Sequence, residues 1–359
     1  MRICFLADSG SAHTRKWCRY FSDRGHEVHV VTFWPGSNGH ARCHELPWPV
    51  DPHGSQFTKL KYLVQGRSIR QLIARIAPEI VHAHYASSYG AACAAAGLSG
   101  HFLSVWGSDI YSFPGSSPLH RALISRSLAK AGFLLSTSRA MAKEASKYTS
   151  RPFGITPFGV DMNLFSPAAR DRIRGDGQFV VGTVKTLTRG YGIDRLLRAS
   201  RLLLDRNPDV PLKIRIAGRG REEAELKALC HELGLAGRTC WLGQISQEAA
   251  VKEWANMDIA VIPSLRESFG VSAIEAQACA RPVIVSDAPG LLESTAPGTS
   301  SIVVNGAEVN GLALAMETLY LDAGIRAAMG AAGRRFVSGN FELSSCFRRV
   351  EELYEESIA

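Results

Sequence analysis

The 359-residue chain lacks several features that would assign a protein to a class at once. Its eight cysteines include no C-x-x-C pair, and most lie in apolar runs, so neither a zinc site nor a disulfide framework is expected. No stretch reaches the roughly 18 apolar residues of a membrane-spanning helix, and the N-terminal apolar run is too short for a signal peptide. These absences predict a cytoplasmic protein whose membrane contact, if any, is peripheral on the inner face.

Signatures of nucleic-acid binding are also missing, because no RNP-like, zinc-finger or helix-turn-helix pattern accompanies the charge. Residues 1–165 carry 18 Lys and Arg against 9 Asp and Glu, a net +9, whereas the remainder carries 23 against 24, a net −1. The basic half is expected to face an anionic lipid surface or a phosphate-bearing acceptor. A basic face that only meets solvent would explain the same count.

Strand-like and helix-like stretches alternate along the whole chain, which predicts an α/β protein. With 46% hydrophobic residues there is enough material for two domains with separate cores. Strands are predicted at 2–7, 26–33, 79–85, 102–106 and 132–138, and again at 179–186, 211–218, 239–243, 258–263 and 282–287.

Residues 166–178 are polar, rich in Gly and Arg and free of apolar periodicity, so they are predicted to be a linker. It separates an N-terminal domain, 1–165, from a C-terminal domain, 179–340. Each domain is predicted to be a doubly wound parallel sheet, with ligand space in a cleft between them. A C-terminal helix within 341–359 is predicted to pack back on the N-terminal domain.

The stretch RESFGVSAIEAQACARPVIVSD, residues 266–287, places two glutamates in a mostly apolar context. Glu267 lies in the loop after a predicted strand, where open parallel sheets bind ligands. At 100° per residue Glu275 falls inside an apolar arc, and a charge there is unfavourable unless groups donate hydrogen bonds to it. The arc consists of Val271, Ile274, Ala278 and Cys279.

Between the glutamates, Phe269, Gly270 and Val271 open the predicted helix, so their N–H groups favour an anion. A phosphate at the helix start, with hydroxyl groups near both carboxylates, describes a nucleotide sugar. In the alternative interpretation Glu267 only complements the helix dipole, and Glu275 pairs with an arginine from elsewhere in the chain.

Two glycine turns follow predicted strands. Gly10 lies in DSGSAHT and Gly218 in IAGRG, and either could cradle a phosphate at the start of a helix. Neither turn has the full Gly-x-Gly-x-x-Gly spacing, and an ordinary strand-to-helix connection has the same composition.

Two histidines and one aspartate lie near predicted strand ends. His82 and His84 share one face of their strand, but two ligands are too few for zinc, and one histidine as a buried hydrogen-bonding group is the commoner outcome. Asp109 lies just past another strand and is a candidate partner for a hydroxyl group.

Taken together, these stretches resemble the retaining glycosyltransferases of the GT-B fold, in particular family 4. RESFGVSAIEA resembles the family's motif of two glutamates separated by seven residues. The likeness continues in family order through HTRKWCRYFSDRGHEVHVVTF, PEIVHAHYASSYG, VWGSDIY, PFGVDMNLFSP, VGTVKTLTRGYGIDRLLRA and IAGRGREEAELKALCHELGL.

The resemblance implies that the C-terminal domain holds a nucleotide-sugar donor and the N-terminal domain holds the acceptor. Glu275 would bind the ribose, Glu267 the donor sugar and Lys185 the diphosphate. The amides of residues 269–271 would lie near sugar and diphosphate, with Gly10 and Gly218 also on the donor side. Candidates on the acceptor side are His13, His84 and Asp109.

The sequence departs from the family at two positions. Gly190 stands where a second cation is usual, and the neighbouring Arg189 is the candidate replacement, because guanidinium binds phosphate in a bidentate way. Trp106 stands where many members have a histidine, as in a subset that resembles this chain.

The chain contains no Asp-x-Asp metal motif, so no metal or cofactor is expected, and cations and helix starts would stabilise the leaving group. UDP-sugars are favoured over GDP-sugars as donors, and the acceptor is expected to be a glycan or lipid-linked. Two alternatives remain: a sugar-nucleotide epimerase of related fold, and a protein that binds a nucleotide sugar without turnover.

Overall fold

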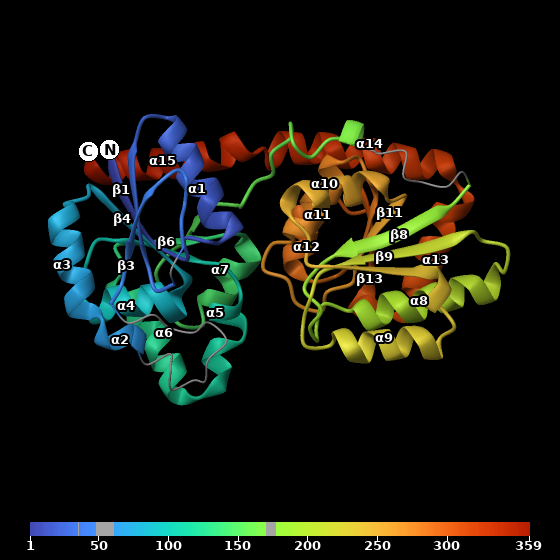
Figure 1. The fold of residues 1–359 in the computed structure, drawn as a ribbon, viewed down its shortest axis with the longest axis horizontal. Helices are drawn as coiled ribbons and strands as arrows, with labels where there is room; N and C mark the ends of the chain where they lie inside the picture. The colour runs from blue at the N-terminus through green and yellow to red at the C-terminus, as the bar shows by residue number, and fades with distance from the viewer. Residues whose placement is uncertain (35, 48–60, 170–176) are drawn as a thin grey trace. The chain divides into compact units, whose positions relative to one another are not determined.

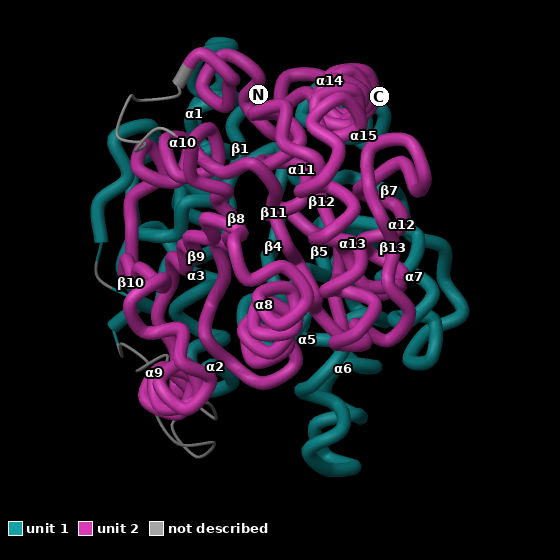
Figure 2. The backbone as a smooth tube through the Cα atoms, turned by 90° about the vertical axis from the view of Figure 1, so that its right-hand side faces the viewer, with its two compact units in different colours: residues 1–158, 346–359 teal, residues 159–345 magenta. Residues whose placement is uncertain are grey.

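The computed structural model describes residues 1–34, 36–47, 61–169 and 177–359. The chain forms two compact units, coloured separately in Figure 2. Unit 1 comprises Met1–Phe158 together with Cys346–Ala359, and unit 2 comprises Gly159–Ser345.

Unit 1 is built on a seven-stranded sheet with the order β3-β2-β1-β4-β5-β6-β7, in which every described strand pair is parallel (Figure 1). The strands are β1 Arg2–Leu6, β2 Glu27–Thr32, β3 Arg42–Glu45, β4 Ile80–His84, β5 Phe102–Val105, β6 Phe133–Ser136 and β7 Gly154–Ile155. Its helices are α1 Ala12–Asp23, α2 Lys61–Val64, α3 Gly66–Ile76, α4 Gly90–Ala95, α5 Ser108–Tyr111, α6 Pro118–Lys130, α7 Arg139–Ala145 and most of α15 Leu343–Ile358.

Unit 2 contains a six-stranded parallel sheet with the order β10-β9-β8-β11-β12-β13. The strands are β8 Phe179–Val184, β9 Leu212–Ala217, β10 Thr239–Gly243, β11 Ile259–Ile262, β12 Val283–Ser286 and β13 Ser301–Val304. The helices are α8 Ile193–Arg206, α9 Glu223–Glu232, α10 Gln247–Asn256, α11 Val271–Ala278, α12 Pro289–Ser294, α13 Val309–Leu321 and α14 Ala323–Asn340.

The two sheets are wound in the same way, so the prediction of two Rossmann-like doubly wound domains is confirmed. In unit 1 the strand order reverses between β1 and β4, and in unit 2 between β8 and β11. Open sheets of this kind bind ligands beyond the carboxyl ends of their strands at this switch point. The fold therefore marks one place in each unit where function is expected.

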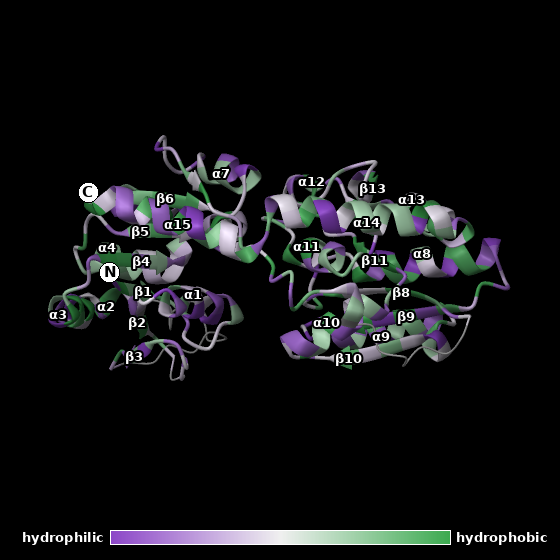
Figure 3. Ribbon diagram, turned by 90° about the horizontal axis from the view of Figure 1, so that it is seen from above, coloured by the Kyte–Doolittle hydropathy of each residue, from purple (hydrophilic) through white to green (hydrophobic). Residues whose placement is uncertain are grey.

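Amphipathic helices cover the sheets. In α1, Trp17, Cys18 and Phe21 are buried, and Gly25 follows the helix at φ 83°, a conformation that glycine adopts without strain. Figure 3 shows both hydrophilic and hydrophobic residues on this helix.

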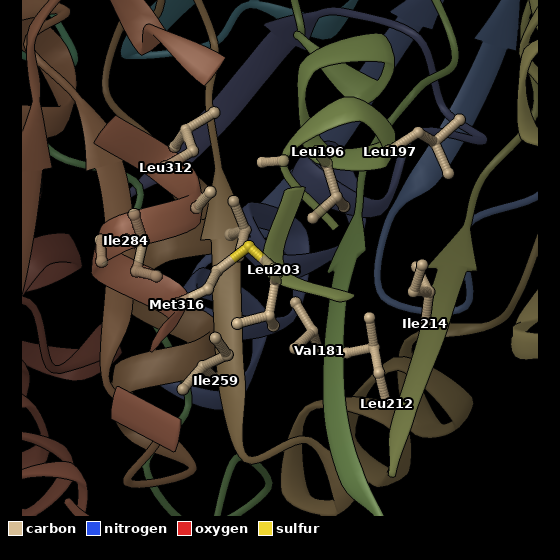
Figure 4. Packing of buried hydrophobic residues seen from close by; sticks show 14 of the residues in the cluster. Val181, Leu196, Leu197, Leu203, Leu212, Ile214, Ile259, Ile284, Leu312 and Met316 are labelled. Atoms are coloured by element: carbon tan, nitrogen blue, oxygen red, sulfur yellow. The ribbon is translucent and has the colours of Figure 1, made fainter. Parts of the chain in front are cut away.

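The core of unit 2 lies between its sheet and two helices, α8 and α13. Figure 4 shows Leu196 and Leu203 of α8 and Met316 of α13 among strand residues such as Val181 and Ile259. All five are fully buried. This packing holds the strands whose carboxyl ends carry the candidate site.

The C-terminal helix α15 packs within unit 1. The buried Glu351 carboxylate accepts hydrogen bonds from Tyr20 Oη (3.1 Å), Arg24 Nε (2.8 Å) and His26 Nε2 (2.7 Å). One turn further along, Tyr354 Oη lies 2.5 Å from His82 Nδ1. The helix is thus tied to unit 1 by polar contacts as well as by apolar packing.

The units divide after Phe158 and after Ser345, whereas the sequence suggested boundaries at 165 and 341. The first division falls earlier because residues 159–165 are bonded to unit 2. Val160 N donates to Phe341 O at 2.8 Å, and Arg334 donates to Phe165 O at 2.9 Å. Residues 170–176 of the expected linker 166–178 lie outside the described residues.

Candidate functional site

An ion pair lies at the switch point of unit 2. Lys185 is the first residue after β8, and Glu267 lies in the loop that leaves β11. Lys185 Nζ is 2.5 Å from Glu267 Oε2, and the two side chains are only 12% and 9% exposed. Two residues far apart in the sequence are therefore brought together where a doubly wound sheet binds its ligand.

The environment of Lys185 keeps this side chain cationic. Burial alone lowers its pKa, but the charge of Glu267, the Tyr191 ring, the hydrogen bond to Glu267 and the charge of Glu275 outweigh burial, so the net pKa is raised. The Tyr191 ring centroid lies 4.5 Å from Lys185 Nζ in a cation–π contact. Sequence analysis did not find Tyr191, since an aromatic residue in a glycine-rich loop carries no specific signal.

The start of α11 adjoins this pair and is held rigidly. Gly270 precedes the helix at φ 96°, and a Cβ there would lie 2.6 Å from Ser294 Oγ. Ser272 Oγ donates to Val184 O at 2.8 Å, which ties the helix to the end of β8. The first N–H groups of a helix have no intrahelical acceptor, so this end presents donors to an anion.

Of the three residues predicted to open this helix, Phe269 has a buried side chain. Its ring packs 5.1 Å from that of Phe341, so only the backbone of Phe269 is available to a ligand. The Glu267–Phe269 turn is fixed from the other side by Gly290, where a Cβ would lie 2.4 Å from Glu267 O.

Glu275 lies on a half-buried edge of α11, not inside an apolar arc as the periodicity suggested. The helix is buried on nearly all sides, and its buried positions include polar Ser272 and Gln277. Apolar spacing therefore does not reveal the open edge, which Glu275 shares with Val271. Glu275 Oε2 accepts a hydrogen bond from the Trp254 indole at 3.3 Å.

Gly218 shapes the same site through the backbone. It adopts φ 139°, and a Cβ there would lie 1.9 Å from Lys185 O, so any side chain would displace the lysine. Arg189 is placed differently, with its side chain 88% exposed and its Nε 3.5 Å from Glu222 Oε1. Gly190 beside it accepts a hydrogen bond from Leu265 N at 2.7 Å.

The residues expected on the acceptor side, His13, His84 and Asp109, all belong to unit 1, and so does Gly10, which was expected on the donor side. Gly10 lies in an exposed turn, and its N–H donates to Asp8 Oδ1 at 2.9 Å. His13 is half-buried and stacks on Phe158, with ring centroids 4.3 Å apart. Burial, and then the charge of Lys16, lower the pKa of His13 to about 4, so the imidazole is neutral at pH 7.

The two histidines of β4 have different surroundings. His82 bonds within the core, with Nε2 2.8 Å from Ser104 Oγ and Nδ1 close to Tyr354. His84 has no hydrogen-bond partner among the described residues, and its ring centroid lies 4.3 Å from that of Trp106. His84 and Trp106 both line a small pocket at the switch point of unit 1.

Asp109 is a buried anchor of the backbone. Its carboxylate accepts hydrogen bonds from Ala86 N (2.9 Å), Trp106 N (3.2 Å) and Gly107 N (2.8 Å). Burial raises its pKa, and these backbone bonds partly oppose that rise. Asp109, which the sequence suggested as a partner for a hydroxyl group, is therefore engaged with the backbone. The sequence shows that Asp109 follows a strand, but not that the surrounding loops enclose its carboxylate.

The described ranges lack two further features. Nowhere in them do three or more His, Cys, Asp and Glu side chains gather in a group that could hold a metal ion. None of their helices has the length and apolar character needed to cross a membrane.

Comparison with known families agrees with this arrangement. Residues 2–138 match the model of the family described as "Glycosyl transferase 4-like", and residues 168–336 match "Glycosyl transferases group 1". The chain belongs to the glycosyltransferases that these two models describe together, the family 4-like glycosyltransferases.

Relatives and solved structures extend the likeness. A D-inositol 3-phosphate glycosyltransferase of Corynebacterium jeikeium is 34% identical over 215 residues, which cover 56% of this chain and 51% of the relative. One from an Arthrobacter strain is 30% identical over 216 residues, 57% of this chain and 51% of the relative. The chain thus spans about half the length of the curated relatives it matches.

Two solved structures share the fold over nearly the whole chain. Sucrose-phosphate synthase from Thermosynechococcus elongatus has a TM-score of 0.84 at 20% identity, covering 99% of this chain and 98% of that one. Anabaena HepE, in complex with UDP and glucose, has a TM-score of 0.81 at 20% identity, covering 99% and 100%. The GT-B architecture inferred from the sequence is confirmed.

Proposed function

We propose that this protein transfers a sugar from a nucleotide-sugar donor, preferably a UDP-sugar, to a hydroxyl group of a glycan or lipid-linked acceptor. The observation that carries the proposal is the Lys185–Glu267 pair at the switch point of unit 2, 2.5 Å apart beside the start of α11. A cation and free helix amides suit a diphosphate, and a carboxylate beside them suits sugar hydroxyls.

In this proposal Lys185 turns from Glu267 toward the diphosphate when the donor enters, and Glu267 then accepts hydrogen bonds from the donor sugar. Glu275, on the open edge of α11, accepts hydrogen bonds from the ribose. The Lys185–Glu267 pair keeps this cation beside the start of α11, so the lysine does not have to be drawn from solvent when the donor enters. Positioning of this kind lowers the reorganisation needed in the transition state.

We infer transfer with retention, through displacement on one face of the donor sugar. The bond from the anomeric carbon to the phosphate oxygen breaks, and the bond to the acceptor oxygen forms. The acceptor's proton passes to the leaving phosphate oxygen. Lys185 and the α11 amides stabilise the charge on the leaving group, so the mechanism needs no metal ion.

The known proteins support this proposal by analogy. HepE is described in complexes with UDP and with UDP-glucose, and sucrose-phosphate synthase shares its fold with this chain. The curated relatives are named for glycosyl transfer to an inositol phosphate. The donor preference for UDP and the hydroxyl acceptor in our proposal follow these examples.

Nucleotide-sugar specificity is tested by thermal shift with UDP-, GDP- and ADP-sugars. A ligand present at 100 times its dissociation constant adds about 2.7 kcal/mol of stability. We expect UDP-sugars to give the largest shift, and UDP to be released only when an acceptor is added. An epimerised donor would support the epimerase alternative, and stabilisation without turnover in any acceptor mixture would contradict the transferase proposal.

We also propose that unit 1 docks on an anionic membrane surface through α6. Leu119, at the start of this helix, is 72% exposed, and Arg121, Arg126 and Lys130 are exposed along it. Between Asp109 and Glu144 the chain carries no acidic residue. An apolar tip within a basic surface suits the interface of an anionic bilayer.

Vesicle co-sedimentation tests the membrane proposal. Binding to vesicles with phosphatidylglycerol should exceed binding to neutral phosphatidylcholine vesicles and should weaken as salt rises. At a fixed salt concentration, Arg126→Ser should weaken binding to the phosphatidylglycerol vesicles, whereas Lys227→Ser in unit 2 should not. Equal binding to both vesicle types, or to neither, contradicts the proposal.

A further inference from the structure

A pocket of ≈ 160 Å³ lies at the switch point of unit 1 and is lined in part by His84, which was expected on the acceptor side. Residues from the ends of β1, β2, β4 and β5, and from the start of α1, surround it. The lining residues include Asp8, Thr14, Trp34, His84 and Trp106. Pockets for drug-sized ligands measure about 300–1,000 Å³, so this one has room for a single small ring and not for a nucleotide.

The wall of the pocket contains a strained backbone. Tyr85, a lining residue, adopts φ 67°, a left-handed conformation that is rare for an aromatic residue, and it opens a π-helix over Tyr85–Tyr89. Asp109 holds this turn through Ala86 N and holds the loop of Trp106 through two further backbone groups. Strain maintained by a buried anchor is typical of a binding site.

Several lining residues carry buried polar atoms without a partner among the described residues. These atoms are Thr14 Oγ1, Trp34 Nε1 and both ring nitrogens of His84. Burial, and then the charge of His13, lower the pKa of His84 to about 3, so the neutral imidazole has one donor and one acceptor. Donors and acceptors together match hydroxyl groups, which can use both.

The charge of the pocket distinguishes between ligand classes. Asp8 is the one charged residue among its described lining residues, and none of them is lysine or arginine. A phosphate beside Asp8 would meet a like charge, with no lysine or arginine among the described lining residues to offset it. The lining also includes the aromatic rings of Trp34 and Trp106, flat surfaces suited to the apolar face of a sugar ring.

We propose that this pocket binds an uncharged, hydroxyl-bearing ring of the acceptor, a monosaccharide or cyclitol unit, and that Asp8 selects against a phosphate on that ring. The inference deepens the proposed transferase function and rests on it. Asp8 accepts a hydrogen bond from a ring hydroxyl, while Thr14 and His84 bind its neighbours. Any phosphate or lipid of the acceptor then lies outside the pocket.

Indole N–H signals in NMR spectra of the full chain test the two units separately. Trp34 and Trp106 report on the pocket, whereas Trp254, which bonds to Glu275 in unit 2, reports on donor binding. Probes are D-glucose, D-galactose, D-mannose and myo-inositol, each beside its monophosphate, and UDP. We expect UDP to shift the Trp254 signal. We expect at least one uncharged ring to shift the Trp34 and Trp106 signals and to bind at least tenfold more tightly than its monophosphate.

Two variants sharpen the test. Thr14→Val keeps the shape of the side chain but removes its hydroxyl group, and should weaken binding of the uncharged ring about 2- to 12-fold. It should not lower Tm, because the removed hydroxyl group has no partner among the described residues. Asp8→Asn should reduce or abolish the difference in affinity between the uncharged ring and its monophosphate. Asp23→Asn, the same change at an exposed site, should leave both affinities unchanged.

The outcomes separate this inference from the proposed function. If UDP shifts Trp254 but no uncharged ring shifts Trp34 and Trp106, the pocket assignment is overturned while the donor site stands. If monophosphates bind as tightly as the uncharged rings, or Asp8→Asn leaves their ratio unchanged, the selection by Asp8 is overturned. If UDP itself does not bind, the proposed function fails first.

Discussion

The two switch points have the same strand order but different chemistry. In unit 2 the site is organised by opposite charges in contact, since Lys185 and Glu267 meet at 2.5 Å beside the start of a helix. In unit 1 the pocket has aromatic walls and neutral polar groups around the single carboxylate of Asp8. Topology therefore determines where a ligand binds, and the residues after each strand determine which ligand it is.

This contrast implies that the site of unit 2 depends on its charges for stability as well as for function, whereas the stability of the unit 1 pocket does not depend on charge. Charged groups removed from water are stable only with partners, but buried hydroxyls are replaced by apolar groups at little cost. Removing a charge at the site of unit 2 should consequently lower stability, whereas removing a hydroxyl group from the pocket of unit 1 should not.

The largest effect is expected for Glu267→Gln. This change leaves the largely buried Lys185 without its carboxylate and should lower the free energy of unfolding by about 3–5 kcal/mol. Urea denaturation at pH 7 measures this loss. Glu223→Gln, which removes the carboxylate of a solvent-screened pair with Lys227, should lower the free energy of unfolding far less.

The effect should depend on pH in a defined direction. The pKa of Lys185 is raised above its ordinary value of 10.5, so the stability that it gains is fully present below that pH and is lost as pH rises through the folded pKa. The stability difference between wild type and Glu267→Gln should therefore be constant from about pH 6 to 9 and shrink above about pH 10.5. A difference that grows toward high pH would contradict the ion-pair account.

Lys185→Met should lower turnover about 10²- to 10³-fold, as the loss of a group that stabilises transition-state charge does. Release of UDP in the presence of acceptor measures this rate. Lys227→Met removes an exposed lysine of unit 2 and should leave turnover unchanged. Combining Lys185→Met with Glu267→Gln should restore part of the lost stability but none of the turnover.

Glu275→Gln should weaken UDP binding by about 1.5–3 kcal/mol, the range for hydrogen bonds to a charged group. The amide oxygen can still accept the bond from the Trp254 indole, so melting should change little. Isothermal titration with UDP and a melting curve check both parts. A destabilised variant that binds UDP normally would assign Glu275 to the fold alone.

A pair of glycine variants compares the two loops directly. Gly270→Ala places a Cβ 2.6 Å from Ser294 Oγ at a positive φ and should destabilise unit 2 by about 1–3 kcal/mol. Gly10→Ala meets nothing closer than Asp8 Oδ1 at 3.5 Å and should leave Tm nearly unchanged. Equal melting shifts would show that the loop of unit 1 is held as tightly as that of unit 2.

Much of this arrangement could be predicted from the sequence. The alternation of strands and helices indicated both doubly wound sheets, and Glu267 was expected after the strand that became β11. Three strands were missed for physical reasons. β3 is an exposed polar edge, β7 has two residues, and the buried pattern of β13 is too short to stand out.

Other features depend on three-dimensional packing and could not be predicted. The periodicity of α11 assumed one buried face, but neighbouring elements surround the helix and leave only the edge of Glu275 open. Asp109 follows a strand, as a ligand-binding residue would, yet three backbone N–H groups enclose its carboxylate. The role expected of Arg189 stays a prediction, with its side chain exposed beside Glu222.

Calorimetric titration of wild type and Glu267→Gln with UDP and with UDP-glucose tests the central claim most directly. If Glu267 binds the donor sugar while restraining Lys185, the variant should bind UDP at least as tightly as wild type but lose the added affinity of the intact sugar nucleotide. Unchanged affinity for both ligands in the folded variant would show that the pair at the switch point of unit 2 is not the donor site.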